Sequence, residues 1–180
     1  DGLMPTDFGS PTTKDIEKLL FKTSDQNRWK FNISTLSRCV FGVGPGEFMA
    51  VMALPETGKS AFAVSLCAGP EGFAEQGARV LYLGNEEETD RTMLRAIQAY
   101  SGMERKQIAK NPSEAMGRFN TISEKLEMQD IQEWDLAKIE SYIENMGCDV
   151  LVLDQGDKIQ INGNFNSSHE RLRELFRRLR

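Results

Sequence analysis

The chain has 180 residues, of which 39% are hydrophobic and 27% are charged, and its formal net charge is −5. This composition is typical of a globular domain, and the acidic balance argues against a protein that coats nucleic acid through bulk electrostatics. No apolar run approaches the roughly 20 residues that a membrane-spanning helix needs, and no signal-peptide pattern opens the chain. We therefore expect a soluble protein without a membrane partner.

The cysteines and the single histidine exclude further kinds of site. Cys39, Cys67 and Cys148 stand among apolar neighbours without a C-x-x-C pair, which is typical of neither a zinc site nor a disulfide framework. We expect buried thiols in a reducing cytoplasm. Because His169 is the only histidine, catalysis must rely on carboxylates, lysine, hydroxyls and backbone amides.

Residues 1–40 are predicted to be a linker segment that precedes the main domain at 41–180. Residues 1–12 are rich in Gly, Pro and Asp, and residues 13–21 have the apolar spacing of a short helix. A glycine-rich turn then leads into residues 47–53, a mostly apolar run that predicts a strand covered on both faces.

Helices and strands alternate through the rest of the chain. Apolar runs at residues 78–83 and 149–153 predict two further strands. Helices are predicted after Lys59, from Thr89 to Ser101, from Asn111 and Pro112 onward, over residues 134–146, and from Ser167 onward. This alternation indicates one three-layer α/β domain with a mostly parallel sheet, and the last helix leads us to expect further core strands beyond residue 180.

The strongest motif is A-L-P-E-T-G-K-S at residues 53–60, between the first predicted strand and a predicted helix. This is the spacing and context of a P-loop, except that Ala53 replaces the first glycine. Loop amides and the helix N-terminus cradle phosphates, the Lys59 ammonium faces the β- and γ-phosphates, and the Ser60 hydroxyl is a hard ligand for Mg²⁺. The predicted nucleotide-binding residues are Ala53, Leu54, Pro55, Glu56, Thr57, Gly58, Lys59, Ser60 and Ala61. The alternative is an ordinary turn between a strand and a helix.

Acidic residues follow both of the later predicted strands. Asp154 ends D-V-L-V-L-D at the sheet edge where parallel α/β folds bind ligands, so it is predicted to hold Mg²⁺ through water. Glu86 leaves the strand at 78–83 toward the same edge as Lys59, where a carboxylate would orient and deprotonate an attacking water. The alternatives are a polar residue that merely ends a strand, and acids that favour a helix N-terminus, which explains Glu87 and Glu88 well.

The P-loop, the acid after the next strand and G-C-D-V-L-V-L-D at 147–154 together resemble the RecA-like ATPase core of DnaB-like replicative helicases and phage primase-helicases. The resemblance implies ATP hydrolysis with Mg²⁺, coupled to translocation on single-stranded DNA in a hexameric ring. It makes Glu86 and Lys59 the catalytic residues and Asp154 the Mg²⁺-associated aspartate. It also implies a primase or polymerase partner and a bacterial or phage-infected cytoplasm.

In such rings the loop after the third strand faces the DNA, so Lys158, Asn162 and Asn164 are candidate DNA contacts. The alternative is a Gly/Asn-rich surface loop, and Asp157 would repel phosphate. The family's arginine finger would lie beyond residue 180, so we expect these residues alone to hydrolyse ATP slowly or not at all. Two rival functions remain open: a RecA-type recombination ATPase, and a nucleotide-dependent loader or regulator without motor activity.

Overall fold

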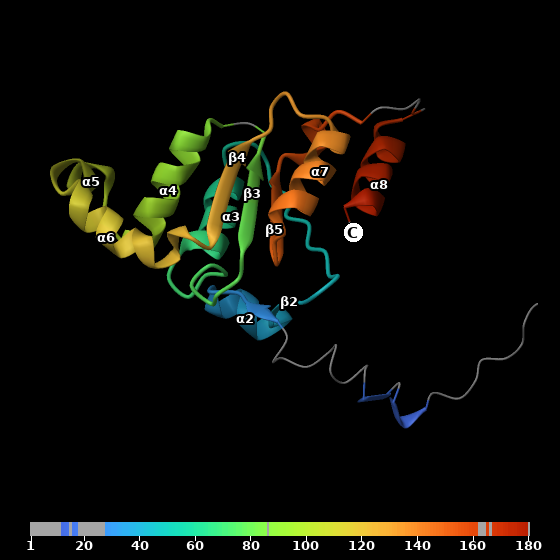
Figure 1. Ribbon diagram of the computed structural model, residues 1–180, viewed down its shortest axis with the longest axis horizontal. Coiled ribbons are helices and arrows are strands. Elements are labelled where there is room, and N and C mark those ends of the chain that lie inside the picture. The colour runs from blue at the N-terminus through green and yellow to red at the C-terminus, as the bar shows by residue number, and fades with distance from the viewer. Residues whose placement is uncertain are drawn as a thin grey trace, which may run out of the picture.

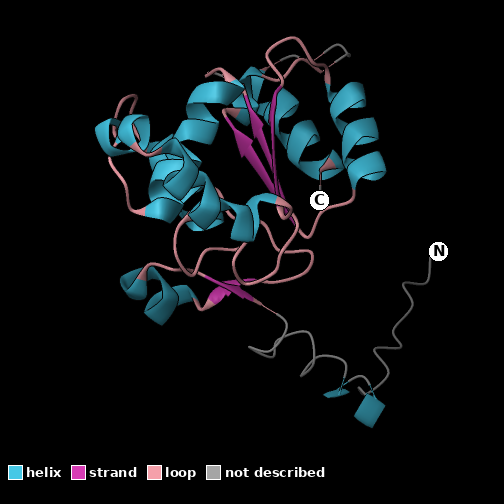
Figure 2. Cartoon of the chain, turned by 60° about the vertical axis from the view of Figure 1, so that its left-hand side comes forward, coloured by secondary structure: helices cyan, strands magenta, loops and turns pink. Residues whose placement is uncertain are grey.

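Three parallel strands form the centre of the computed structural model, with helices on both faces of the sheet (Figure 1 and Figure 2). The structure describes residues 12–14, 16–17, 28–85, 87–161, 165 and 167–179. The elements are β1 (Trp29–Lys30), α2 (Ser34–Val40), β2 (Gly42–Val43), α3 (Lys59–Ala68), β3 (Val80–Gly84), α4 (Thr89–Ser101), α5 (Arg105–Lys110), α6 (Pro112–Ser123), β4 (Leu126–Asp130), α7 (Leu136–Met146), β5 (Val150–Asp154), η2 (Gly156–Lys158) and α8 (Ser168–Arg178).

The strand order is β4-β3-β5, so the wholly buried β3 is central. Side chains alternate between the two faces of a strand. Tyr82 accordingly joins a core with residues of α3, α4 and α6, whereas Leu81 and Leu83 join a second core with residues of α7 and α8. A parallel sheet between two apolar layers confirms the predicted three-layer α/β class.

Local signals explain where the helices on the second face begin and end. The Asp135 carboxylate accepts a hydrogen bond from the Lys138 amide (2.9 Å) and caps α7, which ends at Gly147 with a positive φ of 59°. The Ser167 hydroxyl accepts from the Glu170 amide (3.2 Å) and caps α8, as the sequence predicts. Arg178 pairs with Glu140 and so links α8 to α7.

The strand predicted at residues 47–53 is wrong. The structure places these residues outside every strand, with Met52 92% exposed and Phe48 55% exposed. In the described part of the chain β5 is the outer strand on its side of the sheet, and residues 47–53 do not pair with its open edge, so their backbone lacks the hydrogen bonds that define a strand. Instead, the Phe48 ring packs on Phe176 of α8, with 4.9 Å between centroids.

Several elements escaped the sequence prediction. The edge strand β4 alternates buried and exposed residues along its first half, so it lacks the continuous apolar run of β3. The short strands β1 and β2 pair antiparallel, Trp29 with Val43, across the predicted boundary at residue 41. Most of the helix predicted at residues 13–21 lies outside the described residues, although residues 13, 14, 16 and 17 are helical.

The three cysteines differ in exposure. Cys67 on α3 is completely buried, and burial raises the pKa of its thiol to about 12. Cys148 is partly buried, and burial followed by the neighbouring Asp149 charge raises its thiol pKa as well. Cys39 on α2 is exposed, which corrects the prediction that all three thiols are buried. None of the described helices combines the length and the apolar character that a bilayer crossing requires.

Candidate nucleotide site

The P-loop sequence forms an exposed turn that leads directly into α3. Gly58 has a left-handed φ of 93°, a conformation that favours glycine, and Glu56 has a φ of 61°. The Thr57 hydroxyl donates to the Leu54 carbonyl (2.7 Å) and closes the turn. The residues from Ala53 to Gly58, Pro55 among them, are exposed.

The start of α3 presents backbone donors. The amide of Phe62 donates to the Gly58 carbonyl at 2.9 Å. In an α-helix the amides before this first bond have no intrahelical acceptor, and here they belong to Lys59, Ser60 and Ala61. Such donors, together with the helix dipole, favour an anion, which is the role predicted for this loop.

The end of β5 lies beside the start of α3. The Asp154 carboxylate is 9% exposed, and its Oδ1 atom is 3.9 Å from the Lys59 ammonium. Lys59 and Asp154, both predicted site residues, are 95 positions apart in the sequence. They are nevertheless neighbours in the fold. The distance is that of an ion pair rather than a direct hydrogen bond.

A third residue, which the sequence did not single out, completes this contact. The Tyr82 hydroxyl donates to Oδ2 of Asp154 at 2.9 Å in a buried environment. Burial first, and the Asp154 charge second, raise the pKa of this hydroxyl far above its ordinary value, so Tyr82 stays protonated and remains a donor. The sheet register pairs Gly84 with Asp154, which puts Tyr82 two residues back on the same face.

The acidic turn after β3 is described only in part. Glu86, the predicted catalytic carboxylate, lies outside the described residues. Glu87 binds Arg95 of α4 through both oxygens, one at 2.9 Å, so its carboxylate is already paired within the fold. Glu88 is the N-cap residue of α4 but makes no side-chain cap hydrogen bond.

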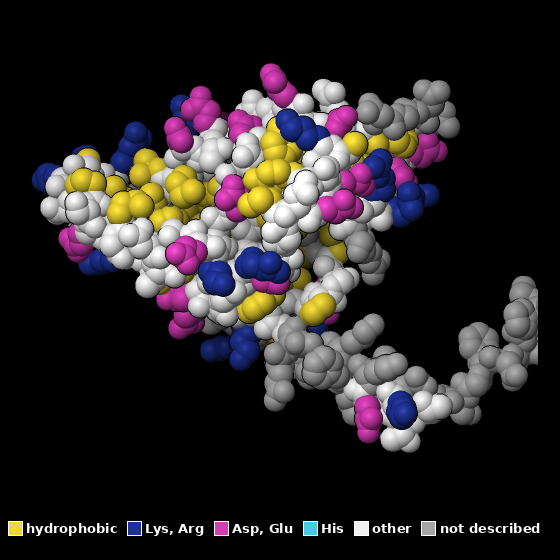
Figure 3. All heavy atoms as spheres, viewed as in Figure 1, with side chains coloured by type: hydrophobic (Ala, Val, Ile, Leu, Met, Phe, Trp, Pro, Cys, Tyr) yellow, Lys and Arg dark blue, Asp and Glu magenta, His cyan; other side chains and the backbone are white. Residues whose placement is uncertain are grey.

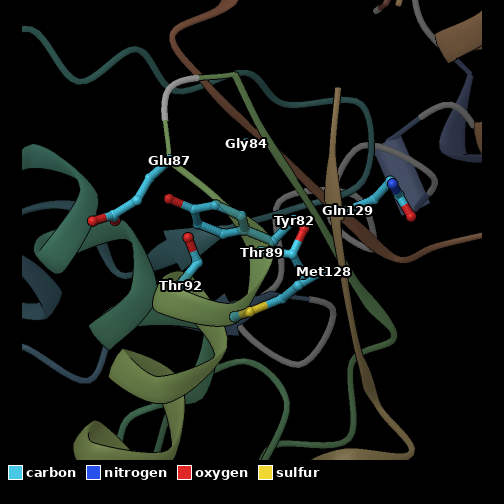
Figure 4. Close-up of a pocket in the computed structure, with 7 residues that line it drawn as sticks. All are labelled: Tyr82, Gly84, Glu87, Thr89, Thr92, Met128 and Gln129. Carbon is cyan, nitrogen blue, oxygen red and sulfur yellow. The ribbon is translucent and has the colours of Figure 1, made fainter. Parts of the chain in front are cut away.

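A small pocket lies between the ends of β3 and β4 and the start of α4 (Figure 4). It is lined by Tyr82, Gly84, Glu87, Thr89, Thr92, Met128 and Gln129. Its empty volume of about 150 Å³ is below the roughly 300 Å³ of the smallest usual ligand pockets, so it does not accommodate a nucleotide. Figure 4 shows the Tyr82 ring projecting toward α4 in this pocket.

The loop after β5 begins with an anchored segment. Gln155 has a left-handed φ of 60°, and Ile159 is 1% exposed in the second core. Arg171 of α8 donates to the Asp157 carbonyl at 2.7 Å. Lys158, one of the predicted DNA contacts, is exposed on η2, whereas Asn162 and Asn164 lie outside the described residues.

The donor set fits Mg²⁺ better than it fits a metal that requires a protein cage. In the described residues no group of three or more His, Cys, Asp or Glu side chains is positioned to hold a metal ion. Mg²⁺ bound with a nucleotide usually takes one or two protein oxygens and completes its shell with phosphates and water. The Ser60 hydroxyl and the Asp154 carboxylate are oxygens of that kind.

A glycine-containing turn that leads directly into α3, with its lysine facing the aspartate at the end of β5, is consistent with a P-loop NTPase core. The sequence model of the AAA domain matches residues 16–180, and the chain belongs to this family. Membership supports a P-loop ATPase and the binding of a nucleotide, typically with Mg²⁺. No curated protein matches the chain.

Proposed function

We propose that this protein is the ATPase core of a replicative DNA helicase that couples ATP hydrolysis to movement along single-stranded DNA. The observation that carries the proposal is the 3.9 Å contact between Lys59 of the P-loop and Asp154 at the end of β5. The resemblance of the P-loop and of residues 147–154 to ring-forming helicases supports the motor function, with residues 41–180 as the motor domain.

Each site residue has a proposed role toward ATP. The amides at the start of α3 bind the phosphates, and the Lys59 ammonium neutralises the charge that develops at the γ-phosphate. Ser60 and Asp154 hold Mg²⁺, Asp154 through water. A cation held there would offset the negative charge of the phosphates. Glu86 orients the attacking water and accepts its proton.

Coupling to DNA is assigned to the loop that follows Asp154. Its anchored start joins the nucleotide site directly to the exposed Lys158, so a change at the phosphates has a short path to a DNA contact. Asn162 and Asn164 extend this contact in the proposal, and six copies would surround the strand. A primase or polymerase is the proposed further partner.

The test combines three measurements on the wild-type protein and on Lys59→Ala and Lys158→Gln variants. These are ATP·Mg affinity, ATP turnover with and without single-stranded DNA, and unwinding of a forked duplex. We expect Lys59→Ala to lose nucleotide affinity, and Lys158→Gln to keep that affinity while losing DNA stimulation. Both substitutions remove one lysine charge, so each controls for the other.

The outcomes separate the rival functions. DNA-stimulated turnover with unwinding supports the helicase, whereas strand exchange by a filament would identify a recombination ATPase. Tight ATP binding with no DNA-dependent turnover, even in an assembled oligomer, would identify a loader or regulator. A wild-type protein that binds no ATP·Mg would overturn the proposal.

A further inference from the structure

The Asp154 carboxylate has two different partners, one on each oxygen. Tyr82 donates a 2.9 Å hydrogen bond to Oδ2, and Oδ1 is 3.9 Å from the Lys59 ammonium. Two contacts from two directions fix the plane of a carboxylate as well as its position. The hydrogen bond is buried, because Tyr82 is 1% exposed and Asp154 is 9% exposed.

We propose that Tyr82 is the positioning residue that holds the Asp154 carboxylate back from Lys59 and so keeps one of its oxygens available to a nucleotide-bound divalent cation. The inference rests on the proposed nucleotide site. Within the described residues, Lys59 is the other partner of this carboxylate, and its ammonium would attract Asp154 once the tyrosine hydroxyl is removed. A closer Lys59–Asp154 pair would then compete with cation binding.

The surroundings of the hydroxyl support a positioning role. Packing by α3, α4 and α6 fixes the ring of Tyr82 on β3. Figure 4 shows Thr92 and Glu87 near the hydroxyl end of the ring and Met128 at the neighbouring strand. Glu87 is paired with Arg95, so that carboxylate is engaged elsewhere. A buried tyrosine hydroxyl needs a hydrogen-bond partner, and here the partner is the carboxylate that faces the P-loop lysine.

The test compares Tyr82→Phe with Tyr142→Phe. Both substitutions remove one hydroxyl that donates to a carboxylate, but Tyr142 on α7 donates to Glu127 (3.2 Å), away from the P-loop residues. Affinity for a fluorescent ATP analogue is measured in excess EDTA and across a Mg²⁺ titration, together with the unfolding temperature of each variant.

In EDTA, we expect Tyr82→Phe to bind the analogue within about twofold of wild type, because the loop amides and Lys59 remain. The Mg²⁺ concentration for half-maximal enhancement should rise about tenfold, as is usual when the support of a metal ligand is removed. Tyr142→Phe should leave both values unchanged. Substituting Asp154→Asn as well should abolish the effect of Tyr82→Phe, because the tyrosine acts through that carboxylate.

Three results would overturn the inference. The first is an unchanged Mg²⁺ dependence in Tyr82→Phe, and the second is an equal loss of affinity with and without Mg²⁺, which shows a purely structural role. The third is a Tyr82 effect that persists with Asp154→Asn. These results differ from failure of the proposed function, in which the wild-type protein itself binds no analogue under any condition.

Discussion

At the scale of single residues, the candidate site contains a partly buried lysine that faces a buried aspartate, and the proposed function adds the glutamate that follows β3 in the sequence. Lys59 and Asp154 are placed by the start of α3 and the end of β5, which are rigid elements. Glu86 lies outside the described residues, and its sequence neighbour Glu87 is held by Arg95. Binding and turnover should therefore respond to different substitutions.

Glu86→Gln should separate these two functions. The amide keeps the size of the side chain but cannot accept a proton, so turnover should fall about 10²-fold or more while ATP affinity stays within about threefold. Single-turnover hydrolysis and equilibrium nucleotide binding measure the two effects. The matched control is Glu88→Gln, which changes an exposed residue that makes no side-chain cap hydrogen bond. Similar losses in both variants would contradict the assignment of Glu86.

Some of the candidate site could be predicted from sequence and some could not. Lys59, Ser60 and Asp154 belong to local patterns, a loop before a helix and an acid after an apolar run, so the chain order alone brings them to one sheet edge. Tyr82 is different, because an aromatic residue inside an apolar strand looks like an ordinary core residue. Its hydroxyl gains a role only once the register sets Gly84 beside Asp154.

At the scale of elements, apolar strands could be predicted from the sequence, whereas the edge strand β4 could not. β3 and β5 are continuous apolar runs and were predicted, whereas β4 begins Leu-Glu-Met and alternates. Residues 47–53 have the composition of a central strand but do not pair with the open edge of β5. The composition of a segment indicates whether its side chains need to be buried. Whether the segment pairs as a strand depends on residues that are distant in the sequence, and a local pattern does not show them.

An ion pair joins the beginnings of β3 and β5 and should make stability depend on pH. Asp149 accepts hydrogen bonds from the Arg79 side chain and amide, which lower the pKa of its carboxyl below the ordinary value. A depressed native pKa stabilises the fold above the unfolded-state pKa near 3.8, and this contribution is lost as pH falls through the native pKa.

Asp149→Asn should therefore lower the free energy of unfolding by about 1 kcal/mol at pH 7, with little difference from wild type near pH 2. Denaturant unfolding at both pH values measures the effect. Glu124→Gln, at an exposed position, is the matched exchange of a carboxylate for an amide and should change neither value. A loss that is equal at both pH values would show that the charge of Asp149 is irrelevant.

Adjacent residues of α8 should differ sharply in their contribution to stability. Leu175 is 1% exposed in the second core, whereas Phe176 is 38% exposed and packs on Phe48. Leu175→Ala should cost about 2–5 kcal/mol through a cavity, and Phe176→Ala about 1 kcal/mol through the lost ring contact. Urea unfolding distinguishes the two, and equal losses would mean that α8 does not pack as described.

At the scale of the whole molecule, apolar side chains are exposed next to the candidate nucleotide site. Phe48, Met49, Val51 and Met52 are each more than 40% exposed in one short segment before the P-loop. Hydrophobic side chains also appear over α4 to α6 in Figure 3. Met116, which belongs to α6, is 42% exposed. Contiguous patches of this kind promote association.

The segment before the P-loop should bind hydrophobic dyes. Replacing Val51 and Met52 by serine should lower dye fluorescence and self-association while leaving the unfolding temperature within a few degrees, because neither residue is buried. Dye titration and light scattering at several concentrations measure the change. Met146→Ser on α7, which is 46% exposed, serves as the control. Equal dye binding by all variants would show that the dye-binding apolar surface lies outside this segment.

Because the three cysteines differ in burial, a thiol reagent should label one of them selectively. Only the thiolate form attacks a maleimide efficiently, so the Cys67 thiol, buried and with a pKa of about 12, should resist modification in the native state. Cys39, exposed on α2, should take up one equivalent of a fluorophore well before Cys148, and peptide mass spectrometry would identify the labelled site. An ordinary maleimide dye would thus report motions of α2 without any engineered cysteine.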